Sequence, residues 1–221
     1  NETIADAERS GWDPRGRATE RATDIIQLDR EIRVAGMVSD PNNYHADHKA
    51  VLAGSDQFSH ADSDPIRLIS SYLDDCWVRP NQVTMGHQVW ATLRFHPKVV
   101  KAVNRNSGDT GVATRQEVAE LLEVNKILVG ASRFNIKRPG QAPVLQRAWG
   151  NMISGQFIDT TADQTGGITW GFTAEHGGKV AGTKDVDMGL HGGELVRSGE
   201  SVKELIIAQR AGFLLTDVVG A

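Results

Sequence analysis

Disulfide chemistry is excluded first, because the 221 residues contain a single cysteine, Cys76. Such sparing use of cysteine is typical of proteins from reducing compartments. Cys76 directly follows Asp74 and Asp75, and nearby carboxylates raise the pKa of a thiol by disfavouring the thiolate. We therefore interpret Cys76 as a partly buried side chain without nucleophilic or redox function.

Long apolar runs and charge clusters are also missing. No run approaches the roughly 20 apolar residues of a membrane-spanning helix, and the first residues lack the basic and apolar regions of a signal peptide. The formal net charge is −4 with no basic tract, which argues against a protein that reads nucleic-acid sequence. We expect neither a membrane partner nor sequence-specific DNA binding.

Enzyme motifs are absent as well. The Gly-rich segments, at Gly166-Gly167, Gly177-Gly178 and Gly189 to Gly193, have neither the phosphate-loop nor the dinucleotide-binding spacing. No Gly-x-Ser-x-Gly nucleophile elbow occurs. The sequence therefore predicts no catalytic residue and no cofactor, and we classify the chain as a non-enzyme.

One cluster allows a competing interpretation. His45, Asp47 and His48 lie within four residues and are of the types that ligate transition metals. They fall in a segment that reads as loop, and further ligands would have to come from elsewhere in the fold. A solvated polar loop is the simpler interpretation, so our expectation is no metal site.

A long helical pattern is the clearest feature that is present. Between Thr19 and Ser39, apolar residues recur at three- and four-residue intervals, interrupted by the polar Asp29. The stripe comprises Ala22, Ile25, Ile26, Ile32, Ala35 and Val38. Residues 1–17 before it are polar and read as extended. The spacing predicts a helix of about five turns, roughly 30 Å long.

Helix-start signals recur downstream. Asp64 before Pro65 and Thr114 three residues before Glu117 each predict a capped helix start. A further helix is predicted from residue 86 to 96, which Pro97 ends or kinks.

Short strands are predicted between and after these helices. Residues 40–64 read as loop, and residues 82–85 and 126–129 as strands, the second of them buried. Beyond residue 139 the pattern is strand and loop, with alternation at 168–173 and no strong period at 180–193. Runs at 201–209 and 213–219 are separated by Arg210-Ala211-Gly212 and predict a hairpin. Helices early and strands late favour an α+β fold.

Several sequence words, in this order, resemble the major capsid proteins of tailed bacteriophages, which have the Hong Kong 97-type coat fold. The words are Leu28 to Ala35, Leu52 to Phe58, Ser63-Asp64-Pro65-Ile66, Arg79-Pro80-Asn81 to Gly86, Val89-Trp90 and Leu93 to His96-Pro97, Ala113 to Leu121, Ile127 to Gly130, Gly193 to Arg197, Glu204 to Ala208 and Phe213 to Leu215. No single word is diagnostic, but the ordered set is fairly specific.

The resemblance implies a Hong Kong 97-like α+β phage capsid fold with a long spine helix, a peripheral domain and an axial domain. It implies that residues 1–17 are the remnant of an extended loop, 18–62 the peripheral domain with the spine helix, 63–165 the axial domain, and 166–221 strands returning through both. The implied function is a structural coat protein, located in the virion and assembled in the host cytoplasm. Its copies would form the hexamers and pentamers of an icosahedral head enclosing double-stranded DNA, with scaffold, portal and decoration proteins as further partners.

Two departures from the family pattern have consequences. About 17 residues precede the long helix, where the family has an arm and a full extended loop, so we expect this chain alone to assemble poorly. Some family members join subunits by a Lys–Asn isopeptide bond whose lysine lies on that loop. The first lysine here, Lys49, follows the helix, so we expect no such crosslink. Trp12 and Trp77 are the candidate anchors of subunit contacts.

Three alternatives remain at this point. An encapsulin-like bacterial compartment would share the fold but enclose a cargo enzyme. A metal-dependent hydrolase would use His45, Asp47 and His48. An ordinary binding module would stay monomeric at high concentration.

Overall fold

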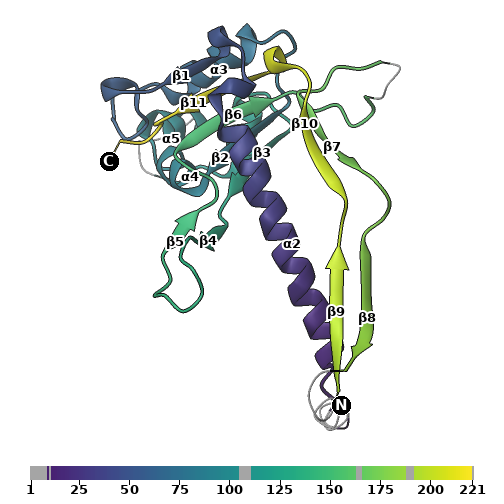
Figure 1. Ribbon diagram of the computed structural model, residues 1–221. Helices are drawn as coiled ribbons and strands as arrows, with labels where there is room; N and C mark the ends of the chain where they lie inside the picture. Colours follow the sequence, from purple (N-terminus) through teal and green to yellow (C-terminus); the bar gives the residue numbers. More distant parts are fainter. Residues whose placement is uncertain (1–8, 10, 105–110, 163–165, 188–191, 221) are drawn as a thin grey trace. The chain divides into compact units, whose positions relative to one another are not determined.

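The computed structural model describes residues 9, 11–104, 111–162, 166–187 and 192–220, and they form two compact units (Figure 1). Unit 1 is Asn1–Arg33 with Thr173–Glu204, and unit 2 is Val34–Phe172 with Leu205–Ala221. Helices and strands occur together, as the α+β prediction requires. Of the Gly-rich segment Gly189 to Gly193, residues 189–191 lie outside the described residues.

Helix α2 (Pro14–Ser39) begins earlier than predicted, so residues 14–17 are helical rather than extended. The Asp13 carboxylate accepts a hydrogen bond from the Gly16 N–H at 2.9 Å, and proline at the first helical position needs no donor partner. At 26 residues the helix is about 39 Å long. Of the predicted apolar stripe only Ala35 and Val38 are buried, whereas Ile25 is 68% exposed.

In unit 1 the long hairpin of β8 (Val180–Val186) and β9 (Gly193–Gly199) was missed by the sequence analysis. The strands are antiparallel, with Val180 opposite Gly199 and Val186 opposite Gly193. Almost every β8 residue is exposed, so the sequence has no apolar alternation to reveal the strand.

Unit 2 is built on a five-stranded sheet in the order β1-β11-β6-β2-β3 (Figure 1). Its strands are β1 (Lys49–Val51), β2 (Gln82–Gly86), β3 (Lys126–Gly130), β6 (Met152–Gln156) and β11 (Gly212–Thr216). β1 runs parallel to β11, β2 runs parallel to β3, and β6 is antiparallel to both β11 and β2. β3 is therefore an edge strand, with only Ile127 buried, rather than the fully buried strand predicted.

The predicted C-terminal hairpin is wrong. β10 (Val202–Ile206) pairs with β7 (Gly171–Glu175), whereas β11 enters the five-stranded sheet. Between them lies a short 3-10 helix, Gln209–Ala211, instead of a hairpin turn. Two strand-like runs close in sequence thus pair with partners far away in the chain.

Four helices of unit 2 come between strands of this sheet in chain order: α3 (Pro65–Asp75), α4 (His87–Leu93), α5 (Pro97–Val103) and α6 (Arg115–Leu121). The predicted caps are confirmed, since Asp64 accepts from Arg67 N–H at 3.2 Å and Thr114 forms a complete capping box with Glu117. Pro97 starts α5 rather than only ending α4, because proline suits the first helical position. The segment predicted as loop, 40–64, also contains β1 and three 3-10 turns.

Alternation along the strands divides the core of unit 2 into two clusters. One sheet face presents Val83, Met85, Ile153, Phe213 and Leu215 to a cluster that includes Ile69 and Leu73 of α3. The opposite face presents Met152 and Leu214 to a smaller cluster, whose other buried members are Ala35, Val38, Tyr44, Trp149, Trp170 and Ala211.

Buried polar side chains on that second face are joined in a network. Tyr44 Oη donates to Val38 O at 2.9 Å and lies 2.6 Å from Ser154 Oγ, while Gln156 links Ser154 and Thr84 at 2.7 and 3.1 Å. Burial raises the pKa of the Tyr44 hydroxyl, which therefore stays protonated. A satisfied network of this kind fixes the register of the sheet.

Candidate functional surfaces

The residues of the alternative metal site, His45, Asp47 and His48, are held in other interactions. His45 caps a 3-10 turn, Ala46–His48, and its Nε2 lies 2.9 Å from Arg210 Nη2. His45 Nδ1 is 3.2 Å from the Asp47 carboxylate, whereas His48 is buried with its ring centroid 5.7 Å from that of His45. Across the described residues, no three His, Cys, Asp or Glu side chains are grouped as metal ligands would be. The adjacent guanidinium also disfavours a cation at His45.

Cys76 is buried, as predicted for a thiol without function. Burial, helped by the charge of Asp75, raises its pKa to about 12. The thiolate that nucleophilic attack or metal binding needs is therefore not populated near neutral pH.

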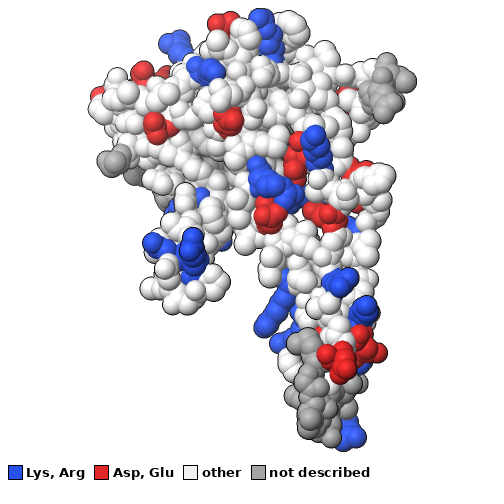
Figure 2. All heavy atoms as spheres, in the orientation of Figure 1, with Lys and Arg blue, Asp and Glu red and all other residues white. Residues whose placement is uncertain are grey.

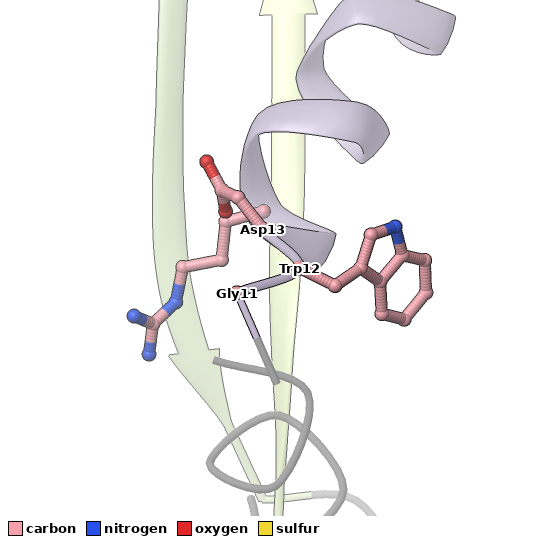
Figure 3. Close-up of a pocket in the computed structure, with 4 residues that line it drawn as sticks. Gly11, Trp12 and Asp13 are labelled. Carbon is pink, nitrogen blue, oxygen red and sulfur yellow. The ribbon is translucent and has the colours of Figure 1, made fainter. Parts of the chain in front are cut away.

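Trp12, the first candidate anchor, stands beside the start of α2 in unit 1. A depression there is lined by Gly11, Trp12, Asp13 and Arg15, and the indole points away from the Asp13 carboxylate (Figure 3). The guanidinium carbon of Arg17 lies 5.8 Å from the centroid of the indole ring. With these partners the indole keeps about half of its surface in solvent.

Trp77, the second candidate anchor, is 72% exposed in unit 2. It follows α3 in a short turn. Its backbone N–H donates to Arg210 O at 3.1 Å, and the Arg210 guanidinium carbon lies 5.1 Å from the centroid of the indole ring. The surroundings are acidic: Asp74 and Glu123 both pair with Arg79. We call Asp74, Asp75, Trp77 and Glu123 the Trp77 patch.

A second surface in unit 2 is the hairpin of β4 (Arg133–Asn135) and β5 (Leu145–Arg147), which was missed by the sequence analysis. Figure 1 shows it extending away from the five-stranded sheet. Asn135 Oδ1 accepts from the N–H groups of Lys137 and Val144 at 3.1 and 3.0 Å, which fastens the connecting loop. The signal in the sequence was compositional: residues 133–147 hold four basic residues and no acidic one.

The exposed side chains of this hairpin combine charge with apolar area. Leu145 is 63% exposed and Ile136 and Val144 are also exposed. Figure 2 shows the basic residues gathered on the hairpin without an acidic one on the face in view. Arg133 and Arg147 occupy directly opposite positions of the two strands.

Unit 1 contains a mostly apolar groove of about 110 Å³ between α2 and the β8–β9 hairpin. It is lined by Thr23, Ile26, Gln27, Lys179, Val180, Ala181, Ser198, Gly199 and Glu200. At its border Thr23 Oγ1 lies 3.2 Å from Ser198 Oγ, and Arg30 pairs with Glu200 at 3.1 Å. These polar contacts attach the helix to the hairpin while the groove stays open.

Comparison with known proteins gives related sequences from phages. The chain is 44% identical over 213 residues to the major capsid protein of Pseudomonas phage JBD67, covering 96% of this chain and 69% of that protein. It is 27% identical over 215 residues to the major capsid protein of Burkholderia phage BcepMu (isolate -/United States/Summer/2002), covering 92% and 66% respectively. The chain thus spans about two thirds of the length of these relatives. No family model matches it.

A solved structure shares the fold. A phage-related protein from Bordetella bronchiseptica RB50 superimposes with a TM-score of 0.78 at 21% sequence identity, covering 91% of this chain and 67% of that one. In the described part of the chain, no helix is both long and apolar enough to cross a membrane.

Proposed function

The chain belongs to the family of bacteriophage major capsid proteins, whose role is structural, and from this premise we propose that its copies form the hexamers and pentamers of a closed icosahedral head around double-stranded DNA. The observation that carries the proposal is the 44% identity over 96% of the chain to a major capsid protein. Hexamers and pentamers of one subunit type require heterologous contacts, in which two different surfaces of the same chain meet.

We further propose that the fold is of the Hong Kong 97 type. In this proposal α2 is the spine helix, residues 18–62 belong to the peripheral domain, residues 63–165 to the axial domain, and residues 166–221 return through both. The length of α2 and the mixed five-stranded sheet with flanking helices support this assignment.

The structural role leaves the alternatives without support. His45 is bonded to Arg210, and the relatives are capsid proteins rather than hydrolases. An encapsulin-like compartment is likewise not favoured by relatives that come from phages. Lys49 lies in β1, where its ammonium donates to Pro41 O at 2.8 Å.

Electron microscopy of the protein expressed from its full coding region tests the proposal. Rings of five or six subunits, or closed shells, are the expected result, and a nuclease-protected DNA content in heads from infected cells would identify the cargo. Shells that hold a protein cargo would overturn the phage-head assignment. Dispersed monomers in the presence of the phage's other head proteins would overturn the capsid role itself.

A further inference from the structure

The β4–β5 hairpin carries positive charges that the chain itself does not neutralise. Among the described residues, Arg133, Lys137, Arg138 and Arg147 form no ion pair. Arg133 and Arg147 are direct cross-strand neighbours, and like charges in that position repel each other. An acidic surface brought from outside would relieve this repulsion.

The Trp77 patch has the complementary character. Asp74, Asp75 and Glu123 are exposed, and Arg79 supplies a positive charge between Asp74 and Glu123. A second positive charge, that of Arg210, lies over the Trp77 ring, so the three carboxylates still outnumber the two guanidinium groups. Within the described chain Asp75 has no ion-pair partner. Trp77 at 72% exposure offers the kind of aromatic anchor that dominates protein interfaces when it is buried.

The two surfaces lie at opposite ends of the same pair of strands. Trp77 precedes β2 and Glu123 precedes β3, whereas the hairpin begins shortly after β3 ends at Gly130. β2 and β3 are parallel and five residues long, so their ends are roughly 15 Å apart. A chain therefore presents its basic hairpin at one end of the sheet and its acidic aromatic patch at the other.

We propose that the β4–β5 hairpin of one copy docks on the Trp77 patch of the next copy, with Leu145 and Ile136 against the Trp77 indole and the basic side chains against Asp74, Asp75 and Glu123. This inference rests on the proposed capsid function, and it names the partner as a second copy of this chain. Two different surfaces meet, so the contact is heterologous and propagates from copy to copy, closing a ring when the rotation permits.

The exposed apolar side chains favour a protein over DNA as the partner. DNA attracts Lys and Arg through its phosphates, but it offers little to Leu145, Ile136 and Val144, which a protein interface would bury. The rest of the chain carries the negative balance of charge, which repels DNA and attracts the hairpin.

Charge reversal in the protein expressed from its full coding region tests the contact. We expect Lys137→Glu with Arg138→Glu to raise the critical concentration for assembly at least about tenfold, as loss of an interfacial charge contact predicts. Asp75→Lys with Glu123→Lys should do the same, and the combined four-residue swap should restore assembly. The matched control is Lys101→Glu with Arg115→Glu, the same charge change at exposed helix ends, which should assemble normally.

A crosslink locates the contact directly. In a Cys76→Ser background, chains carrying Asp75→Cys are mixed during assembly with chains carrying Leu145→Cys, and disulfide-linked dimers are expected under oxidising conditions. Normal assembly of both charge-reversed pairs, or loss of assembly without this crosslink or rescue, would overturn the inference. Normal shells that lose only DNA retention would assign the hairpin to DNA instead. Failure of the unsubstituted protein to assemble would count against the capsid role, whereas failure of the variants to differ from it counts against this contact alone.

Discussion

Unit 1 and unit 2 are stabilised in different ways. Every member of the two hydrophobic clusters belongs to unit 2, whereas no described residue of unit 1 is fully buried. Unit 1 instead joins its helix to its strands by ion pairs, Arg15 with Glu194, Arg30 with Glu200 and Arg33 with Glu204. Apolar burial is the larger source of folding free energy, and ion pairs whose arginines are partly exposed contribute less.

The difference indicates how the subunit's own stability and its contacts with other subunits are divided between the two units. Unit 2 holds both clusters of buried apolar side chains, whereas unit 1 leaves Ile25 and Val180 largely exposed. An apolar stripe without a core of its own gains its stability when it is covered. We infer that unit 1 reaches its full stability through contacts with other subunits.

The largest expected effect comes from the core of unit 2. Phe213 is fully buried, with Gly155 directly against its ring and the Tyr72 ring centroid 5.7 Å away. Phe213→Ala should lower the free energy of unfolding by about 3–5 kcal/mol through lost burial and the cavity left behind. Urea denaturation measures the change. The control Val180→Ala, at an exposed position of unit 1, should cost about 1 kcal/mol or less, and equal losses at both sites would contradict the division between the units.

A smaller and local effect is expected in unit 1. The Glu200 side chain is 6% exposed and pairs with Arg30, so Arg30→Gln leaves a buried carboxylate unpaired at a cost of about 1–3 kcal/mol. Amide hydrogen exchange in β9 should accelerate at least about tenfold while exchange in β2 and β6 stays unchanged. Arg21→Gln, at an exposed position of the same helix, is the control. Acceleration spread evenly over both units would mean that they open together.

The two units are expected to lose stability in different pH ranges. Burial lowers the pKa of His96, which lies 3.0 Å from Ser63 Oγ. The unfolded chain then binds the proton more readily, so unit 2 loses stability as the pH falls below about 6.5 toward the folded pKa. We expect a lower urea midpoint at pH 5 than at pH 7.5, and a flatter dependence in His96→Gln. His87→Gln, at an exposed position, is the control and should keep the pH dependence of the urea midpoint. The same pH dependence in His96→Gln would show that His96 is not its source.

The carboxylates of unit 1 titrate lower. Arg15 and Arg33 lower the pKa values of Glu194 and Glu204, respectively, so their contribution is present above the ordinary glutamate pKa of about 4.3 and is lost as the pH falls through the folded values. Hydrogen exchange at pH 5 should therefore show unit 1 contacts still intact, while unit 2 is already less stable than at pH 7.5.

The smallest effect on the isolated subunit is expected at Ile25. Ile25→Ser removes an exposed apolar side chain and should change the free energy of unfolding by no more than about 0.5 kcal/mol. Assembly should nevertheless weaken, which light scattering at matched concentrations detects. Unchanged assembly would show that this part of the stripe stays uncovered in the shell.

Local signals in the sequence predicted local structure well. The caps at Asp64 and Thr114 depend on residues a few positions apart, and the structure confirms them. The resemblance to phage capsid proteins was also confirmed by the comparisons, because it depended on the order of several words along the chain.

The pairing of strands that are distant in the chain could not be predicted from the sequence. The run that became β11 looked like half of a hairpin, yet it lies between β1 and β6, whose residues are distant in the chain. β8 was missed because its side chains are mostly solvent-exposed and carry no apolar period, so its pairing with β9 was not predicted either. Of the two proposed contact surfaces, Trp77 was predicted from its residue type. The basic hairpin carries no motif, and its signal in the sequence is the absence of acidic residues from 133–147.

The position of β11 also sets the order of events during synthesis. Residues 212–216 form an interior strand that pairs with β1 on one side and β6 on the other. The sheet therefore cannot close until these residues have left the ribosome, however early α2 and α3 form. Translation that stops short of this strand therefore yields a chain whose sheet lacks the connection between β1 and β6 and whose core lacks Phe213 and Leu215.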